Sequence, residues 1–138
     1  MSRPPPAIAA VLKPLPDPVR GRLLELRDLI MRTAAETECV GALIETLKWN
    51  EPAYLAKAPR IGTTIRLNAV KGSARDVALY VNCKTDLVAT YKAHYPHAFR
   101  YEGTRAIIMD AGEVLPELPL AHCIALALTY HLRARTRR

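Results

Sequence analysis

The fold of this chain is decided by residues 63–81, TTIRLNAVKGSARDVALYV, which contain two short runs of mainly β-branched, aliphatic and aromatic residues around a polar loop. Such residues favour extended backbone, and Gly72 interrupts the pattern between the two runs. The segment therefore predicts strands at 63–68 and 77–81 that pair antiparallel through the loop at 71–76.

A helix is predicted on the N-terminal side of this strand pair. Asp17 and Pro18 are typical of a helix start, because an Asp side chain can cap the first turn and proline is tolerated at the first helical position. Apolar residues then recur at three- and four-residue intervals, and the helix is expected to end near residue 35: Val19, Leu23, Leu26 and Ile30. The charged residues outside this stripe are expected on the solvent-exposed face: Arg20, Arg22, Glu25 and Arg27.

Between this helix and the central strands, residues 43–49 alternate in the manner of a strand. Pro52 interrupts the alternation before a short apolar run at 53–55, which predicts a turn followed by a second strand. A helix that continues over residues 39–47 is the alternative interpretation.

The C-terminal half predicts a helix, a hairpin and a second helix. The first helix starts at Thr85 or Asp86 and ends near Pro96, because proline disfavours helical backbone in the residue before it. Residues 99–109 form two strand-like runs around a glycine, and Pro119 begins the last helix. This order of elements predicts an α+β fold, with an antiparallel sheet of about five strands and helices packed on one face.

The length of 138 residues predicts one domain. Residues 1–16 contain five of the eleven prolines, and proline lacks the amide donor that helices and sheets need. We therefore expect a Pro-rich extended arm at 1–16 and a single α+β domain at 17–138.

The formal charge of +7 is concentrated at the C-terminus, where four of the last six residues are arginines; without them the charge is +3. Such a mildly basic body argues against nucleic-acid binding. The tail is expected to be a solvated helix end, and the alternative is a tail that contacts phosphate or anionic surfaces. No apolar run is long enough to span a membrane, and the first residues do not resemble a signal peptide. The expected location is the cytoplasm, without a membrane partner.

The sequence lacks the common motifs of catalysis and cofactor binding. The chain has no phosphate-binding loop, dinucleotide-binding motif, nucleophile elbow or zinc-binding HExxH helix, which lowers the expectation of an enzyme. Its three cysteines are too far apart for a metal knuckle, and its four histidines lack metal-binding helical spacing. We expect reduced structural thiols, no cofactor, no metal site and no assigned catalytic residue.

The most distinctive local sequence is KWNEPAY, residues 48–54. Trp49 and Tyr54 bring large apolar rings with polar ends to a proline-containing turn that also holds a lysine and a glutamate. The stretch has two interpretations: Trp49 fills the core while Pro52 shapes a turn, or the turn lines a ligand pocket.

Several short motifs, taken in order, resemble the YdhG-like family, a bacterial domain of unknown function, over about residues 18–132. They are the Lys-Trp-x-x-Pro-x-Tyr stretch, the two central strands, a Gly-Thr-x-x-Ile hairpin at residues 103–107, and Leu-Pro at 115–116. The resemblance implies a compact α+β domain, and one branch of the family has been linked to frataxin-like iron delivery. Iron binding would need an acidic surface, whereas this chain is basic and its carboxylates are scattered.

The preferred functional hypothesis is a non-enzymatic binding module for a small anionic ligand. Its expected ligand-binding residues are Trp49, Glu51, Tyr54, Arg66, Tyr80 and Arg105, with the two arginines able to clamp an anion. The alternatives are a frataxin-like iron- or metal-handling protein, and a protein-protein interaction module that assembles, for example as a homodimer, through its sheet or its N-terminal arm.

Overall fold

The computed structural model describes the chain from residue 2 to residue 136, and this range contains six strands and five helices. The strands are β1 (Leu43–Lys48), β2 (Glu51–Ala56), β3 (Ile65–Ala69), β4 (Asp76–Tyr80), β5 (Arg100–Glu102) and β6 (Ala106–Asp110). The helices are α1 (Pro6–Leu12), α2 (Asp17–Glu36), α3 (Leu87–His94), α4 (Glu117–Leu128) and α5 (Tyr130–Thr136). The predicted α+β class is confirmed, since all six strands form one antiparallel sheet in the order β1-β2-β3-β4-β6-β5.

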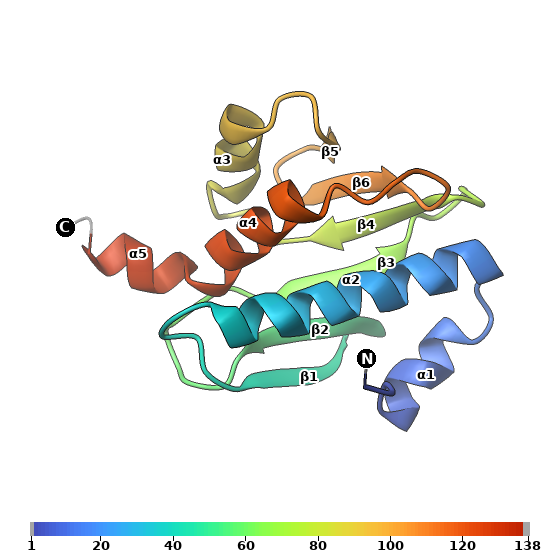
Figure 1. The fold of residues 1–138 in the computed structure, drawn as a ribbon, viewed down its shortest axis with the longest axis horizontal. Helices are drawn as coiled ribbons and strands as arrows, with labels where there is room; N and C mark the ends of the chain where they lie inside the picture. Colours follow the sequence, from blue (N-terminus) through green and yellow to red (C-terminus); the bar gives the residue numbers. More distant parts are fainter. Residues whose placement is uncertain (1, 137–138) are drawn as a thin grey trace.

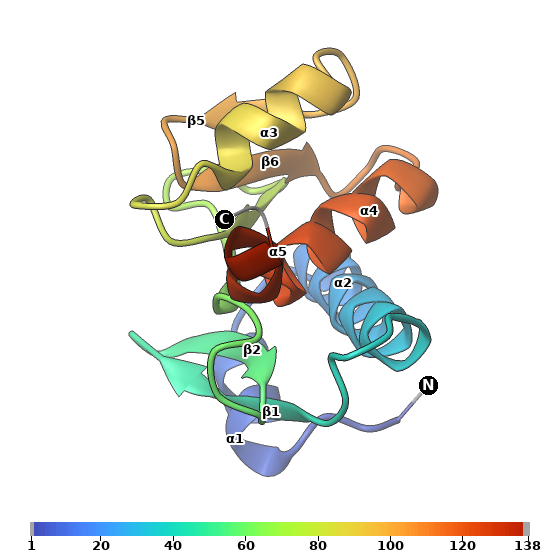
Figure 2. The ribbon, with the colours of Figure 1, turned by 90° about the vertical axis from the view of Figure 1, so that its left-hand side faces the viewer.

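The main hydrophobic core lies between one face of the sheet and the helices. Successive side chains of a strand point to opposite faces, and the fully buried Leu67, Leu79 and Ile107 share the face that meets α2 and α4. Figures 1 and 2 show these two helices on that side of the sheet. The expectation of helices on one face is thereby met.

The opposite face of the sheet has a much smaller apolar cluster. Ala78, Ala106 and Ile108 form it, with Val70 and Tyr80 packed alongside. No helix within residues 2–136 contributes a residue to this cluster. This face, which we call the open face, presents small residues between the longer polar side chains of β3, β4 and β6.

The helix predicted from Asp17 is confirmed as α2, and its apolar stripe is buried. The alternative of a helix over residues 39–47 is wrong, because β1 starts at Leu43 and pairs with β2 along its whole length. The hairpin of β5 and β6 and the helix α3 also lie where the sequence predicts them.

The prediction of an extended arm at residues 1–16 is wrong in its middle, where α1 forms. Pro6 occupies the start of α1, where its missing amide proton is not needed, and the other prolines lie outside the helix. Ile8 and Leu12 are four residues apart, so they lie on one side of α1, and both are buried in the main core. The arm is therefore part of the domain.

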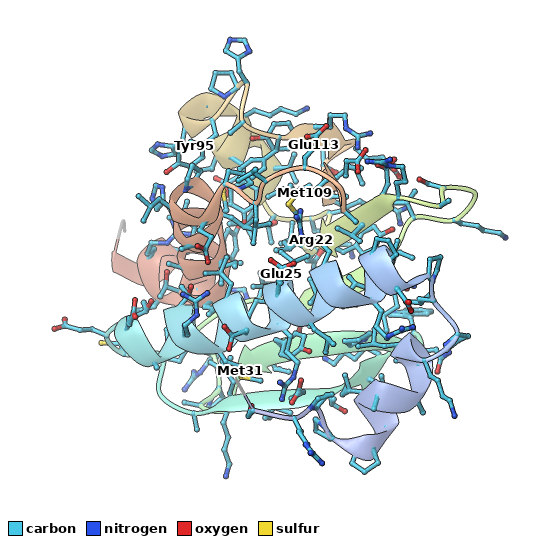
Figure 3. All side chains as sticks on the ribbon, turned by 45° about the vertical axis from the view of Figure 1, so that its right-hand side comes forward. Arg22, Glu25, Met31, Tyr95, Met109 and Glu113 are labelled. Atoms are coloured by element: carbon cyan, nitrogen blue, oxygen red, sulfur yellow. The ribbon has the colours of Figure 1, made fainter. Side chains whose placement is uncertain are left out.

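Two arginines of α2 are buried, although the helical pattern predicted them on the solvent-exposed face. Arg22 donates hydrogen bonds to the backbone carbonyls of Asp110 and Glu113, and Figure 3 shows it extending toward Met109 and Glu113. Arg27 has its partners on β1 and the N-terminal segment, and its side chain is only 6% exposed. Helical periodicity places both residues beside the apolar stripe, but it cannot show polar partners that come from distant segments.

The predicted last helix is divided at Thr129 into α4 and α5, and α4 starts two residues before the expected Pro119. Arg133 donates to the backbone carbonyl of Leu126 and to the Thr129 hydroxyl, so the first tail arginine packs along the helix. The expectation of a solvated tail otherwise concerns residues 135–138, whose side chains lie outside the described part of the structure. No described helix is both long and apolar enough to cross a membrane.

Candidate functional site

The turn between β1 and β2 contains the only tryptophan of the chain. Lys48 and Glu51 are paired residues, so Trp49 and Asn50 form a two-residue hairpin turn. Both have positive φ, 55° and 62°, as in a type I′ turn. Trp49 is 86% exposed, so the interpretation in which it fills the core is wrong. Trp49 does not follow the in–out alternation of β1, because the turn begins at this residue.

A pocket of about 370 Å³ lies beside this turn. Its wall combines the β1–β2 hairpin with the segment that leads into β3, the segment that follows β4, and the residue before β6. Figure 2 shows the hairpin extending away from α2 and α4. The residues that line the pocket are Lys48, Trp49, Thr63, Thr64, Arg66, Val81, Asn82, Cys83 and Arg105.

Strand pairing explains why these segments meet. Arg66 of β3 is the register partner of Tyr80 in β4, so the residues just before β3 and just after β4 lie at the same end of the sheet. The backbone amide of Val81 then donates to the carbonyl of Arg105 over 2.8 Å, which adds the residue before β6.

The segment before β3 also depends on Gly62. A Cβ at this position would lie 2.1 Å from the carbonyl oxygen of Leu128, so only glycine allows this approach to the end of α4. The Thr63 amide donates to the carbonyl of Ala127 over 2.9 Å, and the amide of Leu132 donates to the carbonyl of Ile61 over 3.0 Å. The pocket wall at Thr63 is therefore fixed to the helical layer.

Two arginine side chains of the pocket contact the same tyrosine ring. The guanidinium carbons of Arg66 and Arg105 lie 5.3 Å and 5.4 Å from the ring centroid of Tyr80, within cation–π distance. Burial raises the pKa of the Tyr80 hydroxyl, and the carboxylate of Glu51 raises it further, against the opposing effect of the arginines. Tyr80 is thus a neutral support for both cations.

Glu51 orients Arg66 from outside the pocket lining. One carboxylate oxygen accepts from Arg66 Nη1 over 2.5 Å, and the other accepts from the Asn68 amide nitrogen over 2.9 Å. The Glu51 side chain is only 13% exposed. Because its two oxygens are held by different residues of β3, the Arg66 guanidinium is fixed before any ligand arrives.

The electrostatics of the pocket favour anions. Lys48, Arg66 and Arg105 supply three positive charges, and none of its described lining residues has a carboxylate. Arg105 has one weak ion pair, 3.3 Å long and half-exposed, with Glu102, and Lys48 has no ion pair within residues 2–136. Arginine donors that are not already saturated bind carboxylate or phosphate oxygens well.

The structure brings together five of the six residues that the sequence singled out. Trp49, Arg66 and Arg105 line the pocket, while Glu51 and Tyr80 contact its arginines. Tyr54 does not belong to this group. It is buried on the helix-facing side of the sheet, because its neighbour Ala53, and not Tyr54, is the register partner of Arg66.

Tyr54 lies instead beside the buried Arg27–Glu45 ion pair. Its hydroxyl is buried and neither donates nor accepts a hydrogen bond within the described structure. Burial, followed by the nearby Glu45 carboxylate, raises the pKa of this hydroxyl well above its ordinary value. It is therefore a neutral core residue.

Several lining residues were not predicted as ligand contacts: Lys48, Thr63, Thr64, Val81, Asn82 and Cys83. Five of them lie just before β3 or just after β4, and strand ends that meet in an antiparallel pair were a signal available in the sequence. Cys83 is an exposed free thiol, as is Cys39, whereas Cys123 is buried. No group of three or more His, Cys, Asp or Glu side chains within residues 2–136 is placed to hold a metal ion.

Comparison of the chain with protein-family models, with curated proteins and with solved structures finds no match. The resemblance to the YdhG-like family stays a prediction. Any function of the pocket must therefore be inferred from its own side chains.

Proposed function

We propose that this protein is a binding module for a small anion, with a carboxylate or phosphate group held in the pocket on the open face. The observation that supports the proposal most is that three cationic side chains line one pocket whose described lining has no carboxylate. The volume of about 370 Å³ is within the range of small-molecule sites.

The side chains have distinct roles in this proposal. Arg66, held by Glu51 and by the Tyr80 ring, is the fixed donor, and its planar guanidinium suits two anion oxygens. Arg105 is half-exposed and loosely paired, so it can turn toward a ligand. Lys48 adds a third positive charge from the hairpin.

Neutral donors complete the pocket. The hydroxyls of Thr63 and Thr64 and the amide of Asn82 line the same wall, and such groups hydrogen-bond anion oxygens without adding charge. Cys83 is the one thiol of the lining, and no His, Asp or Glu accompanies it among the described lining residues. We therefore infer binding and assign no reaction, because a nucleophile needs a positioned base.

Isothermal titration calorimetry with inorganic phosphate and with acetate, at constant ionic strength, tests the proposal. A few charge-assisted hydrogen bonds correspond to a dissociation constant on the order of millimolar to micromolar. Arg105→Ala should weaken binding about tenfold, because it removes one such bond without leaving a buried charge.

Arg100→Ala is the matched control. Arg100 is exposed like Arg105 and is also paired with a carboxylate, that of Asp76, but it does not line this pocket. The control should bind phosphate within about twofold of the wild type, since screening weakens charges outside the site. No heat of binding for either anion, or equal losses in both variants, would overturn the proposal. Fe²⁺ belongs in the same titration, because a frataxin-like iron-handling protein is the alternative hypothesis.

A further inference from the structure

The residue at the first position of the β1–β2 turn is unfavourable for the turn itself. A type I′ turn needs positive φ at both central residues, which glycine, asparagine and aspartate tolerate best. Asn50 meets that requirement, but Trp49 has φ 55° with a bulky aromatic side chain. Strained residues of this kind are concentrated at functional sites.

Burial does not compensate for this conformation. Trp49 is 86% exposed, so its large apolar surface remains in water. Trp49 also lines the pocket, together with Lys48 of the same hairpin and with Arg66 and Arg105. An exposed aromatic face next to convergent cations is suited to a ligand that has both a ring and a negative charge.

Volume supports a ligand larger than an inorganic ion. A pocket of about 370 Å³ corresponds to roughly a dozen water molecules, at about 30 Å³ each. A single phosphate or acetate would fill only a small part of that volume and would leave the indole in contact with water. A planar ring attached to the anion would occupy both.

We propose that the ligand of this pocket is an aromatic anion, whose carboxylate or phosphate binds Arg66 and Arg105 while its ring stacks on the indole of Trp49. This inference rests on the proposed anion-binding function and adds the chemical class of the ligand. Trp49 is then the residue that determines specificity, and it occupies the turn at the expense of the stability of the hairpin.

Calorimetry with two matched pairs of probes tests the inference. Phenyl phosphate is compared with inorganic phosphate, and benzoate with acetate, so that the two pairs separate phosphate from carboxylate recognition. The wild type should bind the aromatic member of at least one pair about tenfold more tightly, the factor that ring stacking provides. Equal affinities within both pairs would overturn the inference and leave the proposed function intact. Failure of all four probes to bind would overturn both.

Two variants of Trp49 separate ligand recognition from folding. Trp49→Asn should abolish the preference for the aromatic probe over its non-aromatic partner. It should also raise the melting temperature, because asparagine accepts positive φ. Trp49→Phe should keep the preference without that rise, because it keeps a ring at the same strained position.

Three outcomes would contradict the inference. An aromatic preference that persists in Trp49→Asn would place the ring elsewhere, and a lower melting temperature in that variant would show that the indole stabilises the hairpin. Light scattering on both proteins adds a further arm: a wild type that dimerises, with a monomeric Trp49→Asn, would assign the indole to a second copy of the chain and overturn the inference.

Discussion

Replacement of Glu45 by alanine is expected to lower the free energy of unfolding by about 3 kcal/mol, because it leaves the guanidinium of Arg27 buried without its counter-charge. The side chains of Arg27 and Glu45 are only 6% and 10% exposed. Two hydrogen bonds join them, from Arg27 Nε over 2.5 Å and from Nη2 over 3.0 Å. The Glu45 carboxylate raises the pKa of Arg27, and its removal takes that effect away. Arg27 nevertheless stays charged without its partner, because a guanidinium is always protonated in proteins.

The magnitude follows from what remains around Arg27. Breaking a buried ion pair from one side costs about 3 to 5 kcal/mol. Arg27 Nη1 keeps its bond to the carbonyl of Ser2, 2.7 Å long, and Nη2 keeps a longer one to the carbonyl of Arg3, so the lower end of that range applies. The double replacement Arg27→Met with Glu45→Leu should cost less than Glu45→Ala alone, because it buries no unpaired charge.

Urea denaturation followed by circular dichroism measures these differences. Glu117→Ala is the control, since Glu117 also pairs with an arginine of α2, Arg32, but on the exposed surface, and little change is expected. A loss of less than about 1 kcal/mol for Glu45→Ala, or a double variant less stable than Glu45→Ala, would refute the reasoning.

Three further predictions concern the elements around the pocket and the core. Ile8→Ala should destabilise the protein by about 2 to 4 kcal/mol in the same assay, because Ile8 of α1 is 2% exposed in the main core. An unchanged urea midpoint would instead support an extended arm at residues 1–16. Gly62→Ala should lower the melting temperature, since its Cβ would overlap the Leu128 carbonyl, and Gly21→Ala, which has open space, should not. Burial, then His94 and Arg133, lower the pKa of His122 below its ordinary value near 6.5. The folded state thus favours the neutral ring. The free energy of unfolding should therefore be constant above about pH 6.5, the ordinary pKa of histidine, and fall as the pH drops below it. His122→Gln should flatten this dependence in urea titrations between pH 5 and pH 8.

Local pattern was sufficient to predict most strands and helices, and part of the site. The β-branched runs at 63–68 and 77–81 predicted an antiparallel pair, and their actual register places Arg66 opposite Tyr80. Alternation then puts both side chains on the same face. The contact between an arginine and an aromatic ring was therefore predictable from the sequence. The sequence did not show which face of the sheet the helices would leave uncovered.

The errors arose where one residue of register or a distant partner decides the outcome. The shared short motif predicts that Tyr54 lies near Trp49 in the site, but the two-residue turn sets the register of β2 so that Tyr54 faces the helices. Periodicity does not show where a strand ends and a positive φ begins, so the sequence allows both the core and the pocket interpretation of Trp49. Arg27 was assigned to the surface because its partners, Glu45 and the N-terminal carbonyls, come from other segments.

The most direct test of the anion-binding pocket is a ¹⁵N–¹H NMR titration of the protein with inorganic phosphate at constant ionic strength. The single indole N–H, of Trp49, marks the hairpin side, and the backbone amides of Asn82, Cys83 and Arg105 mark the opposite wall. If the pocket binds phosphate, these four signals shift saturably with one common dissociation constant, while the amides of α1 stay in place. Signals that do not move, or shifts confined to surfaces away from the open face, would contradict it.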